Sequence, residues 1–198
     1  MLGDRRKIVF ISGSAYEYGR FGDTGKAFIR DLSKNLLKND FQLVSGFGSG
    51  VGAYIIEGAM EEIYLERKEK IGTQLQVYPF PFAESGSHSE IIKTTYREDM
   101  ISQADVVIFL FGNKLEDISV KEADGMLKEF EIARANKAVL IPVGVSGYIS
   151  EKLWNTIITQ YDDFFETREN FELYRQLGDP YTDPDQLIDI IIQIAKAR

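Results

Sequence analysis

The chain has 198 residues, 44% of them apolar, and a formal net charge of −8 at neutral pH. This length and composition are typical of a globular protein, and we expect one domain that spans residues 1–198. The chain contains no cysteine and one histidine, His88, which excludes disulfide frameworks, thiolate sites and histidine-rich metal sites. No basic cluster offsets the negative charge, so we expect no nucleic-acid partner.

The first residues run directly into an apolar strand pattern at 7–12, which leaves no room for a signal peptide. No apolar run approaches the roughly 20 residues that cross a bilayer. We therefore expect a cytoplasmic protein without a membrane partner.

Short apolar runs alternate with amphipathic segments along the chain. Helical spacing of apolar residues predicts helices at 25–38, 53–70, 90–103 and 120–136, and apolar runs predict strands at 7–12, 41–46, 74–80, 104–112 and 138–144. Strands that alternate with helices of this length indicate βαβ units. The predicted fold is α/β: a Rossmann-like, doubly wound, mainly parallel five-stranded sheet with helices on both faces.

The residues from 150 to the end are predicted to be helical, and an Asp-Pro pair marks the start of the last helix. That helix has a wide apolar surface, formed by Leu187, Ile188, Ile190, Ile191, Ile192 and Ile194. The surface either packs on the sheet or, in part, contacts a second subunit.

Glycine and serine are frequent in the loops that follow the predicted strands, such as SGSAYEYGRFGDTG, GFGSGVG, PFAESGSHS and FGNKLEDIS. In a parallel sheet these loops meet at one edge, where ligands bind. Backbone N–H groups in such loops suit oxygen-rich ligands. The candidate binding residues from these loops are Gly13, Ser14, Gly48, Ser49, Gly50 and Gly112.

The glycines of GFGSGVG permit two interpretations, a tight turn or a phosphate that approaches the backbone at a helix N-terminus. The P-loop spacing is absent, which argues against ATP hydrolysis. The alternating glycines follow the second strand and lack a clear acidic ribose clamp, which argues against an ordinary NAD dehydrogenase. We expect a pyrophosphate-bearing nucleotide to lie against this turn.

The loop aromatics Tyr16, Tyr18 and Phe21 either stack on an adenine or pack locally. His88 is interpreted as a solvated loop residue, as part of a helix cap, or as a residue that reaches a ligand. A lone arginine or glutamate on a helix is usually solvated or ion-paired, and Glu129 has Lys128 and Arg134 nearby in the sequence.

Several segments together resemble the SLOG superfamily: GSA, SGFGSGVGAYIIEGAM, YREDMISQADVVIFLFGN and DGMLKEFEIARANKAVLIPVG. This Rossmann-like group includes LOG phosphoribohydrolases, the DNA-processing protein DprA and nucleotide sensors of bacterial conflict systems. LOG enzymes carry an arginine before a Met-x-x-x-Ala-Asp strand entry and a glutamate after Pro-Gly-Gly-x-Gly-Thr. Here Arg97 lies at the arginine position and Glu129 falls near the glutamate position, whereas a longer segment with Lys114 replaces the glycine loop.

The resemblance covers nearly the whole chain and is closest to the C-terminal SLOG sensor domains of Thoeris anti-phage effectors. It implies a regulatory domain, without catalytic residues, cofactor or metal, that binds a cyclic ADP-ribose isomer made by TIR-domain proteins. Binding would activate an upstream sirtuin-like NADase domain, and a homo-oligomer is expected. Arg97, Lys114 and Glu129 map to ligand-contacting positions: the two cations would offset pyrophosphate charge and the carboxylate would orient a ribose.

The alternative is a LOG-like phosphoribohydrolase that acts on nucleoside 5′-monophosphates. In that enzyme Arg97 would hold the phosphate and Glu129 would stabilise an oxocarbenium-like transition state. The replaced glycine loop favours the sensor over the enzyme.

Overall fold

The computed structural model describes residues 5–67, 72, 74–79 and 87–197. Its centre is a five-stranded sheet in the order β3-β2-β1-β4-β7, in which every neighbouring pair is parallel. The strands are β1 (Ile8–Ser14), β2 (Gln42–Ser45), β3 (Leu75–Val77), β4 (Val106–Phe111) and β7 (Val139–Pro142). The predicted five-stranded parallel sheet is confirmed.

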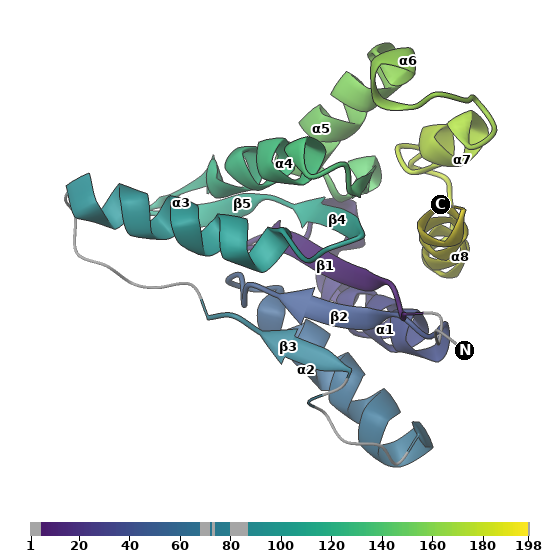
Figure 1. The fold of residues 1–198 in the computed structure, drawn as a ribbon, viewed down its shortest axis with the longest axis horizontal. Helices are drawn as coiled ribbons and strands as arrows, with labels where there is room; N and C mark the ends of the chain where they lie inside the picture. Colours follow the sequence, from purple (N-terminus) through teal and green to yellow (C-terminus); the bar gives the residue numbers. More distant parts are fainter. Residues whose placement is uncertain (1–4, 68–71, 73, 80–86, 198) are drawn as a thin grey trace.

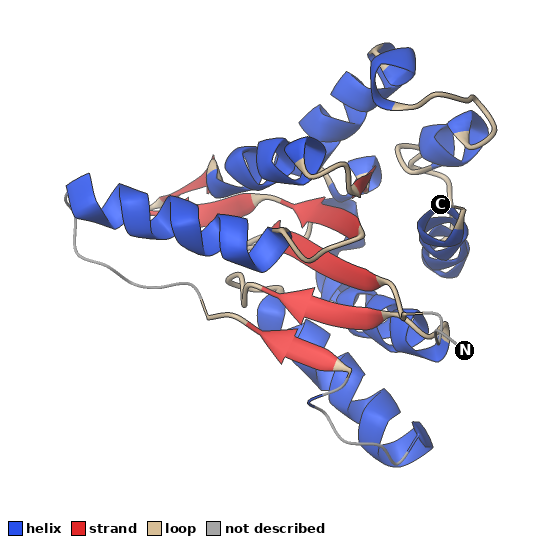
Figure 2. Cartoon of the chain, in the orientation of Figure 1, coloured by secondary structure: helices blue, strands red, loops and turns tan. Residues whose placement is uncertain are grey.

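Helices cover both faces of this sheet (Figures 1 and 2). On one face lie α1 (Gly25–Lys38) and α2 (Gly52–Met60), and on the other lie α3 (Ser87–Ile101) and α4 (Gly125–Ala135). The C-terminal part is helical, as predicted, with α5 (Tyr148–Thr159), α6 (Tyr161–Phe164), α7 (Phe171–Gln176) and α8 (Pro184–Lys196).

Strand β4 shows why the sequence folds this way. All six of its residues are apolar and buried, because helices cover the sheet on both sides and leave no solvated face. Strand β1 pairs with β4 on one side and with β2 on the other. The chain leaves β1 through α1 toward β2 and leaves β4 through α4 toward β7, so the strand order reverses between β1 and β4. Such a reversal opens a crevice at the carboxyl ends of these two strands.

The apolar surface of α8 is buried within the chain. The side chain of Asp183 accepts a hydrogen bond from the Asp185 N–H and begins the helix, with Pro184 in its first turn. All six predicted apolar residues of α8 are buried, and the helix packs against β7, α1 and α7. The packing interpretation of this surface is therefore confirmed.

The predicted helix at 120–136 is wrong at its start. Residues 113–122 form an antiparallel hairpin of β5 (Asn113–Glu116) and β6 (Ser119–Glu122), and α4 begins only at Gly125. The pairing of Glu116 with Ser119 leaves Asp117 and Ile118 as a two-residue turn, and Asp117 has a φ of 56°. A short polar residue tolerates this left-handed backbone, which hairpin turns require.

The predicted helix at 53–70 also differs in detail. After Met60 the winding changes to a π-helical segment, Glu61–Arg67, in which the consecutive residues Glu62 and Ile63 are both buried. Positions 68–70 of that prediction lie outside the described residues, as do residue 80 of the third strand, most of the following loop and the side chain of His88. Within the part of the chain that is described, no helix has the length and apolar character to cross a membrane.

Candidate functional site

A cavity of about 150 Å³ lies at the carboxyl end of β1, beside the reversal of strand order. Strand β1 contributes its last residues, the loop after β2 contributes Gly46 and Gly48, and α3 contributes Arg97 and Met100. The first turns of α4 close it with Gly125, Met126 and Glu129. Pockets for whole organic ligands are about 300–1,000 Å³, so this cavity fits one phosphate or ribose group with the remainder of a ligand outside.

Two oppositely charged side chains meet in this cavity. The Arg97 Nε atom lies 3.5 Å from Glu129 Oε1, and both side chains are largely buried. A Cβ at Gly125 would lie 3.0 Å from Arg97 Nη2, so the glycine leaves room for the guanidinium at the start of α4. The predicted neighbours of Glu129 are engaged elsewhere: Lys128 pairs with Glu90, and Arg134 stacks over Phe164.

Glu129 also accepts a hydrogen bond from the hydroxyl of Ser12, with 2.6 Å between Oγ and Oε2. Burial raises the pKa of Glu129, and the Ser12 hydrogen bond and the Arg97 charge oppose part of that rise. The site therefore contains a carboxyl group that takes up a proton more readily than an ordinary glutamate. It also contains a guanidinium, which stays charged.

Ser14 is a second serine at the end of β1. Its Oγ atom is buried and has no hydrogen-bond partner among the described residues, and the residue lines the cavity. A buried hydroxyl without a partner is uncommon in native proteins. It suits a hydrogen bond to a bound ligand.

The glycine-rich turn after β2 packs against the loop after β1. A Cβ at Gly48 would lie 1.9 Å from the Gly13 carbonyl oxygen, and one at Gly50 would lie 1.8 Å from the Ala15 carbonyl oxygen. Ala15 N donates to the Ser49 carbonyl oxygen at 2.8 Å. The glycines thus permit a close approach of two backbones, and Gly50, with a φ of 70°, also needs a left-handed conformation. A nucleotide at this turn stays a prediction.

The structure brings together some of the predicted residues and separates others. Gly13, Ser14, Gly48, Arg97 and Glu129 line the cavity, whereas Ser49, Gly50, Gly112 and Lys114 are not among its described lining residues. A Cβ at Gly112 would lie 2.6 Å from Ile149 Cβ, so packing explains this glycine. Lys114 is half-exposed on the hairpin, with Nζ 3.6 Å from Glu116 Oε1.

Two of the three loop aromatics pack locally. The Tyr18 ring meets Phe111 edge to face and its hydroxyl donates to the Gly50 carbonyl oxygen, while Phe21 stacks on Phe28. Tyr16 is exposed. Local packing therefore accounts for Tyr18 and Phe21, and stacking on an adenine stays a prediction for Tyr16.

Three residues near the site were not predicted. Ser12 holds Glu129, and its signal in the sequence was a polar residue that directly follows four apolar residues of a strand. Asn113 is fully buried, and its Oδ1 accepts from the backbone N–H groups of Tyr16 and Glu17, which ties the first loop to the hairpin. Phe47 is 46% exposed with a φ of 55°, and its two neighbours both line the cavity.

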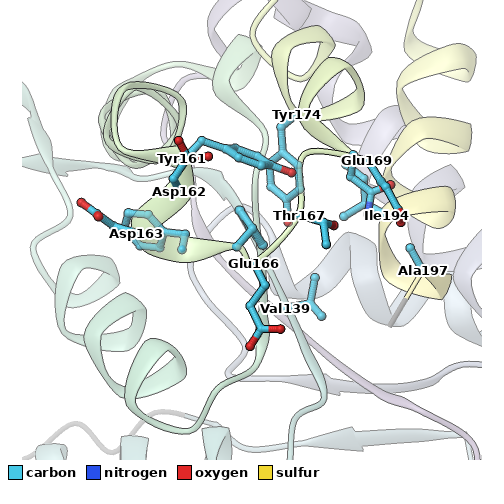
Figure 3. Close-up of a pocket in the computed structure, with 13 residues that line it drawn as sticks. Val139, Tyr161, Asp162, Asp163, Glu166, Thr167, Glu169, Tyr174, Ile194 and Ala197 are labelled. Carbon is cyan, nitrogen blue, oxygen red and sulfur yellow. The ribbon is translucent and has the colours of Figure 1, made fainter.

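A larger cavity, of about 430 Å³, lies at the other end of the strands (Figure 3). Val139, the first residue of β7, and Ala197, next to the end of α8, place it at the amino-terminal edge of the sheet. Its described lining includes four carboxylates and no lysine or arginine: Asp162, Asp163, Glu166 and Glu169. An acidic lining repels phosphate groups, so this cavity does not suit an anionic ligand.

Curated proteins of similar sequence cover almost all of this chain. It is 39% identical over 200 residues to the NAD(+) hydrolase ThsA of Cytobacillus dafuensis and 35% identical over 195 residues to the NAD(+) hydrolase ThsA of Bacillus cereus (strain MSX-D12). Each match covers 97% of this chain but only 40% of the relative. The chain thus spans about two fifths of the length of these relatives.

Solved structures share the fold at low sequence identity. The X-ray structure of TM1055 has a TM-score of 0.52 and 14% identity, covering 75% of this chain and 81% of that chain. DNA processing protein A from Helicobacter pylori, whose structure concerns single-stranded DNA binding, has a TM-score of 0.50 and 15% identity, covering 94% and 80%. These likenesses show the fold alone. A family model matches residues 3–198 and confirms the resemblance seen in the sequence: the chain belongs to the Sir2- and TIR-associating SLOG family.

Proposed function

We propose that this domain is a sensor that binds a cyclic ADP-ribose isomer and thereby activates a NAD(+)-hydrolysing domain of the same protein. The observation that carries the proposal is the buried pair of Arg97 and Glu129, in a cavity where doubly wound sheets bind their ligands. Arginine binds phosphate oxygens through several N–H groups, and a carboxylate accepts hydrogen bonds from ribose hydroxyls. Cyclic ADP-ribose isomers contain both phosphate and ribose groups.

The small volume of the cavity fits this assignment. One phosphate or ribose would enter it, and the remainder of the ligand would lie across the loops after β1 and β2, where Tyr16 and Phe47 expose aromatic rings. Aromatic rings offer stacking surfaces for an adenine.

The length of the relatives supports a sensor that is linked to an effector. Proteins named as NAD(+) hydrolases extend well beyond the matched region, since 40% of each is covered. We assign the NAD(+) hydrolase activity to the unmatched part of these proteins. We assign to the present chain a regulatory role in anti-phage defence, in response to a signal made by TIR-domain proteins. A sensor must have different structures in its bound and free states. We propose that this domain forms a homo-oligomer in the cytoplasm, and that the oligomer differs between the two states.

A phosphoribohydrolase that acts on nucleoside monophosphates is the second candidate. The observation that favours it is Glu129, a buried carboxyl group with a raised pKa beside an arginine, which is an arrangement common at catalytic sites. The hairpin of β5 and β6 argues against it, because it occupies the segment where such enzymes have a glycine loop.

Calorimetric titration of the wild-type domain with cyclic ADP-ribose isomers, ADP-ribose, NAD and AMP tests the first proposal. Arg97→Ala and Glu129→Ala should each weaken binding by about 2–5 kcal/mol, or roughly 30- to several-thousand-fold, because each removes a buried charged partner. Lys114→Ala should weaken it less, because its side chain is 44% exposed. Arg175→Ala is the matched control, since Arg175 pairs with Glu172 on the surface of α7.

Unchanged affinity in both Arg97→Ala and Glu129→Ala would contradict the assignment of the site. The same samples, incubated with AMP, distinguish the two candidates by chromatography of free adenine. Steady release that Glu129→Ala abolishes would establish the hydrolase in place of the sensor.

A further inference from the structure

We propose that Ser12 is a positioning residue of this site, which holds the Glu129 carboxylate at a fixed distance from Arg97. This proposal rests on the proposed function for its effect on ligand affinity. The effect of Ser12 on the titration of Glu129 does not depend on any ligand.

Ser12 is rigidly placed. It is 1% exposed and lies in the central strand β1, paired in register with Phe109 of β4. Its Oγ atom donates to Glu129 Oε2 at 2.6 Å, which is the short distance typical of a hydroxyl bound to a carboxylate. A strand at the middle of a parallel sheet thus fixes one oxygen of a side chain that comes from α4.

The second oxygen of the same carboxylate faces Arg97. Its distance to Nε is 3.5 Å, longer than the 2.7–2.9 Å usual for a tight charged hydrogen bond. Ser12 thus prevents the carboxylate from turning toward the guanidinium into a closer, two-point pair. A closer pair would neutralise Arg97 and compete with an anionic group of a ligand.

Without the Ser12 hydroxyl, two changes are expected. Glu129 becomes free to rotate toward Arg97, and it loses a donor that favours its ionised form. The charged group that faces Glu129 from α3 is Arg97. Strand β1 contributes the Ser12 hydroxyl, and on α4 the adjacent Lys128 is paired with Glu90. The titration of Glu129 therefore reports on Ser12 directly.

The test uses Ser12→Ala, Ser12→Cys and Ser12→Thr. Alanine removes the donor, cysteine keeps a similar volume with a weak donor, and threonine keeps the hydroxyl. Ser33→Ala is the matched control: Ser33 is fully buried and donates to the Ile55 carbonyl oxygen at 2.7 Å, between α1 and α2. Carboxyl-detected NMR titration of the ligand-free proteins gives the Glu129 pKa, and calorimetry with cyclic ADP-ribose isomers and inorganic pyrophosphate gives affinities over a range of pH.

We expect Ser12→Ala and Ser12→Cys to lower the Glu129 pKa, because a two-point pair with the Arg97 guanidinium supplies two charged hydrogen bonds where the hydroxyl supplied one. The same closer pair should weaken ligand binding by about tenfold or more. Ser12→Thr should restore both values. Ser33→Ala should change neither, although it removes a buried hydrogen bond as well. The pH at which affinity changes should move downward with the Glu129 pKa.

An unchanged or raised Glu129 pKa in both Ser12→Ala and Ser12→Cys would overturn the proposal, as would an equal shift in Ser33→Ala. If the wild-type domain binds none of the probes, the proposed function fails, and the NMR titration still decides the role of Ser12. If the wild type binds and the Ser12 variants bind equally well, the positioning role is wrong and the proposed function stands.

Discussion

Glu129 is the residue with the most unusual surroundings in the site. A carboxylate removed from water loses solvation that one arginine and one hydroxyl offset only in part, and burial raises the pKa of Glu129 accordingly. A residue placed for stability alone would be better replaced by an apolar one. A buried carboxyl group beside an arginine thus points to a role in binding rather than in stability.

The pH dependence of unfolding tests the state of Glu129. Because its folded-state pKa is raised above the ordinary 4.5, the folded protein binds this proton more tightly than the unfolded chain. The free energy of unfolding of the wild type, relative to Glu129→Gln, should therefore rise as the pH falls through the raised pKa, and level off below the ordinary value of 4.5. Urea unfolding of both proteins across this range measures it. A difference that is independent of pH would show that Glu129 titrates as an ordinary glutamate.

The turn after β2 is the element that shapes the site. The positions of Gly48 and Gly50 are determined by carbonyl groups of the neighbouring loop, so the same glycines that suit a phosphate are also required by the fold. From the sequence, a bound phosphate and close packing of two loops explain these glycines equally well. The distances between the loops after β1 and β2 show that packing alone is sufficient.

Alanine substitutions separate these glycines from an unconstrained one. Gly48→Ala and Gly50→Ala should each lower the free energy of unfolding by about 3 kcal/mol or more, because the new Cβ overlaps a carbonyl oxygen. Gly72→Ala is the control: its backbone lies outside the left-handed region and no atom lies within 4 Å of a Cβ there, so its cost should stay below about 1 kcal/mol. Denaturant unfolding gives the three values. A small cost at both Gly48 and Gly50 would show that the two loops separate easily.

The regular elements were largely predictable and the hairpin was not. Apolar runs specify strands such as β4, and the helix over Gly25–Lys38 was predicted with the observed bounds. The four-residue strand Ser119–Glu122 has too few residues to show a period, and its pairing depends on the Asp117 turn. Arg97 and Glu129 were identified through family motifs. Ser12 was missed because its contact joins residues 117 positions apart.

At the scale of the whole molecule, α8 completes the core and leaves self-association to other surfaces. Its apolar residues are buried, and the helix packs against β7, α1 and α7. Figure 1 shows α8 beside α7 near the C-terminus. Large apolar side chains that remain exposed lie elsewhere, on α3, on α4 and on the hairpin, for example Ile91, Leu127 and Ile118. A proposed oligomer therefore has no apolar surface available on α8.

Paired isoleucine substitutions distinguish core packing from subunit contact. Ile191→Ala, at a fully buried position of α8, should lower the free energy of unfolding by about 2–5 kcal/mol through the cavity that it creates. Ile118→Ala, at a side chain that is 98% exposed, should change it by no more than about 0.5 kcal/mol. Light scattering, with and without a cyclic ADP-ribose isomer, should give the same molar mass for folded Ile191→Ala as for the wild type. If Ile191→Ala instead alters the molar mass and leaves unfolding unchanged, α8 forms a subunit contact and its packing against β7 contributes little to the stability of the domain.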